Sequence, residues 1–152
     1  GNFTESALLI KQAHQLGINV PFMGGDTWET QEFNDVGGKD VEGAVMSTAF
    51  DREKASTQEA QKFLKAYTDE YKAEPSALSA MAYDAYLIAI DAIKRANSVE
   101  PQKIRDAIAT TKDLEAVTGK TTLDKNGDAE KVGVIKVVKE GKFKYLDFVD
   151  AK

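Results

Sequence analysis

The order in which hydrophobic periodicities follow one another is the feature of this 152-residue chain that most restricts its fold. Over about the first 50 residues the pattern alternates, predicting helices at about 5–16 and 29–36 and strands at about 18–23 and 43–50. Helices that alternate with strands are typical of a parallel sheet covered by helices. The sequence therefore predicts an α/β fold with a parallel sheet.

The middle of the chain contains three predicted helices with no strand between them. A capping box at residues 56–59 begins the first, Pro75-Ser76 the second and Pro101 the third, and they end near residues 72, 97 and 111. In the second and longest helix, apolar residues recur at three- and four-residue spacing in a wide stripe. We expect this helix to be largely buried.

The C-terminal part of the chain changes to β periodicity. Residues 118–123 predict a short strand, and residues 132–139 and 142–149 alternate around Glu140-Gly141, which indicates a β-hairpin. The segment 124–128 begins like a calcium-binding loop but lacks the glycine and the final glutamate at the required positions. We interpret that segment as a polar turn.

Composition excludes several classes of function. The net charge of −5 and the isoelectric point of about 5.0 disfavour general binding to nucleic acids. The absence of cysteine removes disulfides and thiol catalysis, and no apolar run approaches the roughly 20 residues that span a bilayer. The chain begins at Gly1-Asn2, almost directly with a helix and without Met, as we expect of a fragment or a processed piece.

No pattern of catalytic or metal-binding residues is recognisable. His14 is the only histidine, and no Ser lies at a spacing that suggests a catalytic triad, so we interpret His14 as a surface or groove-packing residue. The carboxylates Glu53, Glu59, Asp69 and Glu70 alternate with lysines and are predicted to face solvent. We therefore predict no catalytic residue, no metal site and no cofactor.

Asp26 is the strongest candidate for a ligand contact. It follows an apolar strand and the pair Gly24-Gly25, and ligands of open α/β sheets bind outside the carboxyl ends of the strands. A carboxylate there, beside Phe22 and Trp28, could pair with a ligand ammonium group. Asp is also a common helix cap, so Asp26 could instead cap the helix that follows. The residues alone leave both hypotheses open.

Two aromatic residues also have two interpretations each: Phe3, which precedes the first predicted helix, and Trp28, which follows the first predicted strand. Trp28 could wall a ligand pocket, or its indole could pack beneath a loop. Phe3, just before the first helix, could pack against Leu8 as a hydrophobic staple or could face a ligand.

Several motifs, in one order along nearly the whole chain, resemble a known family. They are residues 1–13, PFMGGD at 21–26, AYDAY at 82–86, DAIKRA at 91–96 and VTGKTTLDKNGD at 117–128. The chain resembles the C-terminal part of the branched-chain amino-acid binding proteins, which are type I periplasmic binding proteins that supply ABC transporters.

The resemblance implies a fold of two α/β lobes that close on a ligand like a hinge. It assigns residues 1–49 to the C-terminal lobe, residues 50–119 to the N-terminal lobe, and residues 120–152 to a crossing strand and the C-terminal-lobe hairpin. The three consecutive helices would then pack on a sheet formed by a part of the protein that precedes this chain. We expect a periplasmic or extracellular protein, lipid-anchored in its full-length form, that delivers its ligand to a membrane permease.

The resemblance also assigns roles at the candidate site. It implies that Asp26 is the partner of a ligand's α-ammonium group and that Phe3 lines the same pocket with a ring that lacks a tyrosine hydroxyl. Thr27 and Trp28, which adjoin Asp26, would belong to the same site. The expected ligand is an amino acid, branched-chain or similar.

Two alternative functions can be compared with ligand delivery. A ligand-sensing receptor domain would have the same fold and stays an alternative. An α/β enzyme is disfavoured, because no nucleophile or acid–base pair is found in the sequence. If the rest of a two-lobe protein is absent, apolar residues such as Leu87, Ile88 and Ile90 lack a covering sheet. We expect the chain to cover them by self-association.

Overall fold

The computed structural model describes residues 1–150, so residues 151 and 152, at the end of the predicted hairpin segment, lie outside the described part. The chain divides into two compact units. Unit 1 contains residues 1–49 and 133–149, and unit 2 contains residues 50–132 with residue 150. The chain therefore passes from unit 1 to unit 2 after Ala49 and returns after Val132.

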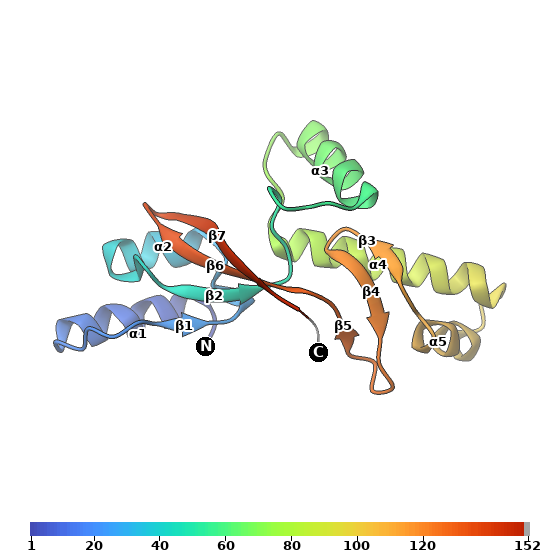
Figure 1. Ribbon diagram of the computed structural model, residues 1–152, viewed down its shortest axis with the longest axis horizontal. Coiled ribbons are helices and arrows are strands. Elements are labelled where there is room, and N and C mark those ends of the chain that lie inside the picture. The colour runs from blue at the N-terminus through green and yellow to red at the C-terminus, as the bar shows by residue number, and fades with distance from the viewer. Residues whose placement is uncertain (151–152) are drawn as a thin grey trace. The chain divides into compact units, whose positions relative to one another are not determined.

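Unit 1 is built on a four-stranded sheet in the order β1-β2-β6-β7 (Figure 1). The strands are β1 (Met23–Gly24), β2 (Val45–Thr48), β6 (Gly133–Lys139) and β7 (Lys142–Val149). The α/β class is confirmed. The sheet is mixed, because β1 and β2 are parallel whereas the C-terminal hairpin joins β2 in antiparallel register. The prediction of a parallel sheet holds only for β1 and β2.

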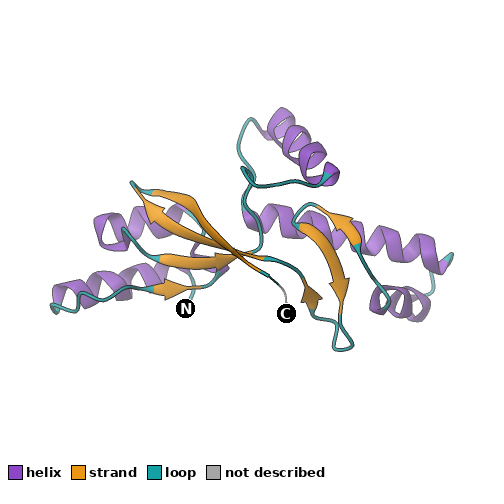
Figure 2. Ribbon diagram, in the orientation of Figure 1, coloured by secondary structure: helices purple, strands orange, loops and turns teal. Residues whose placement is uncertain are grey.

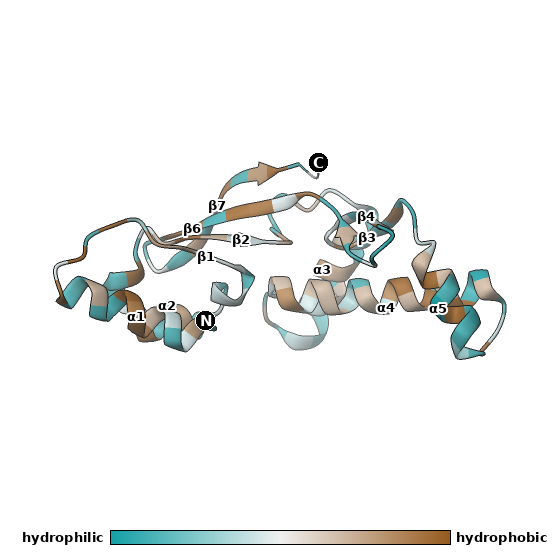
Figure 3. Cartoon of the chain, turned by 90° about the horizontal axis from the view of Figure 1, so that it is seen from below, coloured by the Kyte–Doolittle hydropathy of each residue, from teal (hydrophilic) through white to brown (hydrophobic). Residues whose placement is uncertain are grey.

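Two helices, α1 (Phe3–Gln15) and α2 (Gln31–Gly37), lie on one face of this sheet (Figure 3). Two short 3₁₀-helices connect the elements, η1 (Asp26–Trp28) before α2 and η2 (Gly38–Val41) after it. Apolar side chains from both layers form one core, which consists of Ala7, Ile10, Trp28, Phe33, Val41, Ala44, Met46 and Val138. The site residues predicted from the sequence all lie in this unit.

The strand predicted at 18–23 is much shorter than expected, because only Met23 and Gly24 pair with β2. Pro21 has no backbone N–H to donate to a neighbouring strand, and Ile18 and Val20 are exposed in the connection from α1. The first helix also begins earlier than predicted, with Asn2 rather than Thr4 at the cap position. These boundaries place Phe3 inside α1.

Unit 2 contains the three predicted helices, α3 (Gln58–Tyr71), α4 (Ala77–Ala96) and α5 (Pro101–Ala109). They accompany a small antiparallel sheet of β3 (Leu114–Ala116), β4 (Gly119–Leu123) and β5 (Ala129–Glu130), shown in Figure 2. The hydroxyls of Thr57 and Ser76 cap α3 and α4 by accepting bonds from backbone N–H groups three residues on.

The expectation that the longest helix is largely buried is wrong within this chain. In α4, only small or polar residues, Ala77, Ala80, Asp84 and Ala92, are buried. Leu78, Tyr83, Tyr86 and Ile93 are exposed, because α4 packs mainly against α5 and the short strand β3. The residues Leu87, Ile88 and Ile90 are partly buried.

Among the described residues, no helix combines the length and the apolar character needed to cross a membrane.

Candidate functional site

The segment 24–29 in unit 1 connects the carboxyl end of β1 to α2 and contains the candidate Asp26. Gly25 is the cap of η1, and the Trp28 and Glu29 N–H groups donate to the carbonyls of Gly25 and Asp26 at 3.1 and 3.0 Å. The Asp26 side chain is partly buried. Within residues 1–150, its carboxylate forms no hydrogen bond or ion pair. The carboxylate is thus held on a short, hydrogen-bonded turn without a protein partner.

The helix that follows this segment is capped by a different residue. The Thr30 hydroxyl accepts a hydrogen bond of 3.2 Å from the Phe33 N–H at the start of α2. Asp26 lies four positions earlier in the chain, at the first residue of η1. The hypothesis that Asp26 caps α2 is therefore wrong, which removes the main structural explanation for this carboxylate.

Trp28 anchors the segment in the core of unit 1. Its side chain is only 8 % exposed and stacks on Phe33, with ring centroids 4.9 Å apart and an angle of 18° between the rings. The indole also lies directly against Gly24, where an added Cβ would come within 2.2 Å of the ring. The indole therefore packs beneath the loop, and its role as a wall of a ligand pocket stays a prediction.

The other two site residues predicted from the sequence lie in the same unit as Asp26. Phe3 is the first residue of α1, is partly buried and packs against the core that contains Trp28. Leu8 is 45 % exposed, and Phe3 lies inside the helix rather than before it, so the staple hypothesis is wrong. Thr27 is partly buried within η1.

A buried ion pair three residues from Asp26 was not predicted from the sequence. The Glu29 carboxylate accepts a hydrogen bond of 2.7 Å from the Thr48 hydroxyl of β2 and pairs with the Lys136 ammonium of β6 at 2.5 Å. The Glu29 and Lys136 side chains are 11 % and 7 % exposed. The sequence does contain one indication of this ion pair. Val134, Lys136 and Val138 follow two-residue spacing in β6, so the strand pattern places the Lys136 charge on the same buried face as the two valines.

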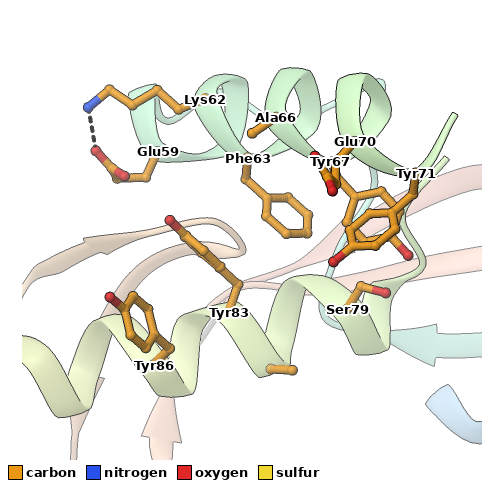
Figure 4. Close-up of a pocket in the computed structure, with 11 residues that line it drawn as sticks. Glu59, Lys62, Phe63, Ala66, Tyr67, Glu70, Tyr71, Ser79, Tyr83 and Tyr86 are labelled. Carbon is orange, nitrogen blue, oxygen red and sulfur yellow. Dashed lines mark hydrogen bonds and ion pairs between the residues drawn. The ribbon is translucent and has the colours of Figure 1, made fainter. Parts of the chain in front are cut away.

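Unit 2 contains a groove between α3 and α4 that is lined by aromatic rings (Figure 4). Adjacent rings in the row Tyr71, Tyr67, Phe63, Tyr83 and Tyr86 have centroids 4.7–5.7 Å apart. At one end, Lys62 and Glu59 form a 2.6 Å hydrogen bond, which raises the pKa of Lys62. The groove is lined by aromatic rings together with the hydroxyls of Ser79 and the tyrosines.

Two other polar clusters have structural explanations. In unit 2 the buried Asp84 carboxylate accepts bonds from the Val117 and Thr118 N–H groups and joins α4 to the turn before β4. In unit 1, His14 Nδ1 lies 3.0 Å from an Asp40 carboxylate oxygen, which joins α1 to η2. Over the described residues, no group of three His, Cys, Asp or Glu side chains is arranged to hold a metal ion.

Sequence comparison identifies the family to which this chain belongs. The family model described as periplasmic binding protein matches residues 1–142, so the chain belongs to that family. Among curated relatives, the leucine-, isoleucine-, valine-, threonine- and alanine-binding protein of Pseudomonas aeruginosa is 29 % identical over 134 residues. That match covers 84 % of this chain and 34 % of the relative.

Solved structures support the same assignment. The leucine-binding protein LivK of Thermotoga maritima superposes with a TM-score of 0.93 at 37 % identity, over 99 % of this chain and 43 % of that one. The branched-chain amino-acid binding protein LivJ of Streptococcus pneumoniae, solved with isoleucine, gives a TM-score of 0.85 at 29 % identity. It is matched over 98 % of this chain and 42 % of its own. The chain thus spans about two fifths of the length of these relatives.

Proposed function

We propose that this chain supplies part of the ligand site of an amino-acid-binding protein that serves an ABC importer, and that Asp26 binds the ligand's α-ammonium group. The observation that carries this proposal is the Asp26 carboxylate, which lies at the carboxyl end of β1 and has no partner within residues 1–150. A partly buried carboxylate without a partner is costly, and a cationic ligand group relieves that cost.

The chemistry of Asp26 agrees with the ligands of the relatives. Those relatives bind leucine, isoleucine, valine, threonine or alanine, and every one of these ligands carries an α-ammonium group at neutral pH. A charge-assisted ammonium–carboxylate bond contributes about 1.5–3 kcal/mol. Such a bond fixes the orientation of the amino acid but does not select its side chain. Branched-chain amino acids are the proposed ligands.

The residues beside Asp26 complete this part of the proposed site. Thr27 follows Asp26 in η1, and Phe3 and Trp28 pack around the same core. We propose that Trp28 supports the Asp26 segment from below, and that Phe3 forms an apolar side of the ligand pocket with a ring that lacks a hydroxyl. The remaining contacts, including those to the ligand carboxylate, would come from residues outside this chain.

The whole protein is proposed to have two lobes that close on the ligand by a hinge. Residues 1–49 would belong to the C-terminal lobe, residues 50–119 to the N-terminal lobe, and residues 120–152 to the crossing strand and the C-terminal hairpin. Two observations support this arrangement: the chain covers about two fifths of these solved relatives, and it leaves unit 1 after Ala49 and returns to it after Val132. The proposed location is periplasmic or extracellular, with a lipid anchor, and the proposed partner is a membrane permease.

A thermal-shift screen of the full-length protein against the standard amino acids tests this function. A ligand that binds only the folded state raises the melting temperature in proportion to the logarithm of its concentration. Leucine, isoleucine and valine are expected to raise it most. A protein that responds to no amino acid, or equally to analogues that lack the amino group, would contradict the proposal.

A further inference from the structure

The segment that carries Asp26 is tied to the sheet of unit 1 through Glu29. The Glu29 N–H donates to the Asp26 carbonyl at 3.0 Å, so the backbone of Glu29 closes the turn on which Asp26 lies. The Glu29 side chain points the other way, toward the sheet, and meets Thr48 and Lys136. Glu29 therefore connects the backbone at Asp26 to two strands.

The two partners of Glu29 belong to the two central strands of the sheet, Thr48 to the end of β2 and Lys136 to β6. Thr48 pairs with Val134 across β2 and β6, and Lys136 pairs with Met46 on one side and Tyr145 on the other. Strands with neighbours on both sides hold their side chains in fixed positions. An ion pair with so little exposure is favourable only when its geometry is well satisfied, which further restricts where Glu29 lies.

The contacts of Glu29 also distinguish its carboxylate from that of Asp26. The Glu29 charge is compensated by the Lys136 ammonium at 2.5 Å and by the Thr48 hydroxyl at 2.7 Å. Asp26, three residues earlier, has no such compensation within the described residues 1–150. Two acidic residues in one short segment thus have different surroundings and different roles.

We propose that Glu29 is a positioning residue, which through Thr48 and Lys136 holds the η1 turn so that the Asp26 carboxylate is preorganised for the ligand's ammonium group. This inference rests on the proposed function of Asp26. Preorganisation matters because a contact made by a mobile side chain loses part of its energy to ordering. A loosened turn would keep Asp26 but weaken its bond.

A first test uses the fluorescence of Trp28, which is the only tryptophan of the 152-residue chain. Trp28 lies between Asp26 and Glu29, so its emission reports the packing of this segment without any ligand. Glu29→Gln and the milder Thr48→Val are expected to shift the emission to longer wavelength and to increase quenching by acrylamide. Glu32→Gln is the matched control, because Glu32 is an acceptor for Thr4 on the exposed side of α2.

A second test is a double-mutant cycle measured by calorimetry with leucine in the full-length protein. If Glu29 acts through Asp26, Glu29→Gln weakens binding by about tenfold in the wild-type background and much less in the Asp26→Asn background. A purely structural role predicts the same factor in both backgrounds. Thr48→Val should repeat the pattern in case Glu29→Gln fails to fold.

The outcomes separate the inference from the function on which it rests. Full-strength leucine binding by Asp26→Asn would overturn the proposed role of Asp26, whereas the Trp28 emission would still show whether Glu29 holds the segment. Unchanged Trp28 emission in both Glu29→Gln and Thr48→Val would overturn the inference. An equal loss of affinity in the two Asp26 backgrounds would overturn it as well.

Discussion

At the scale of single residues, Gly24 and Gly25 differ sharply in their tolerance of a side chain. A Cβ on Gly24 would lie 2.2 Å from Trp28, whereas a Cβ on Gly25 would meet nothing within 4 Å. Gly24→Ala is therefore expected to displace the indole and to destabilise the chain by about 1–3 kcal/mol, and Gly25→Ala to change little. Urea unfolding followed by Trp28 fluorescence measures both. Equal midpoints for the two variants would contradict this packing.

Thr121 and Thr118, in or next to β4, form a second matched pair. Thr121 is fully buried, and its hydroxyl has no hydrogen-bond partner among the described residues. Thr118 donates its hydroxyl to Asp84 at 2.5 Å and accepts from Lys131 at 2.6 Å. We expect Thr121→Val to be neutral or stabilising by about 1 kcal/mol and Thr118→Val to be destabilising by about 1–3 kcal/mol. Urea unfolding followed by circular dichroism measures the stability of both variants. A Thr121→Val variant less stable than Thr118→Val would contradict the assignment of these hydrogen bonds.

Asp26 could be recognised from the sequence as a candidate ligand contact, but the ion pair of Glu29 with Lys136 could not. Asp26 was recognisable because an apolar stretch and two glycines precede it within a few positions. Glu29 was not, because its partners Thr48 and Lys136 are 19 and 107 positions away. Local patterns carry no information about which distant strand becomes a neighbour, so the ion pair appears only once the sheet is formed.

At the scale of elements, the turn at 124–128 has a predicted dependence on pH. N–H bonds, first from Asp128 and then from Asn126, lower the pKa of the Asp124 carboxyl from its ordinary value of 3.8. A carboxyl with a lowered pKa in the folded state stabilises the fold above the ordinary pKa, and this contribution is lost as the pH falls through the lowered pKa. The turn should thus stay closed at neutral pH and loosen only in acid.

Amide chemical shifts of Asn126 and Asp128 in a pH titration measure this behaviour, because both N–H groups donate to the Asp124 carboxylate. Their common midpoint is expected below 3.8 and should disappear in Asp124→Asn. A midpoint at or above that value would contradict the hydrogen-bonded turn.

Helices were easier to predict than strands, for a physical reason. The helix starts at Thr57 and Ser76 depend on hydroxyls that bind N–H groups three residues away, so the sequence shows them directly. Strand β1 depends on pairing with β2 about 20 residues later, and Pro21 limits it to two residues. Strand β3 was missed altogether, since three residues leave almost no alternation to detect.

At the scale of the whole molecule, the exposed apolar surface predicts self-association of this chain. On α3 and α4, Tyr71 and Tyr86 are 65 % and 55 % exposed. Light scattering of the 152-residue chain is expected to show a mass that rises with concentration, and Tyr86→Ser should reduce the rise. Asn19→Ser, at an exposed polar position in the other unit, is the control and should leave it unchanged. A monomer at every concentration would contradict the prediction.

The proposed bond between Asp26 and the ammonium group of an amino acid can be tested by calorimetry. The full-length protein and its Asp26→Asn variant are titrated with leucine and with 4-methylpentanoate, which lacks the amino group. We expect Asp26→Asn to weaken leucine binding by about tenfold or more but not to weaken the binding of 4-methylpentanoate, which has no ammonium group to pair with the carboxylate. Leucine affinity that is the same in both proteins would contradict the proposed bond.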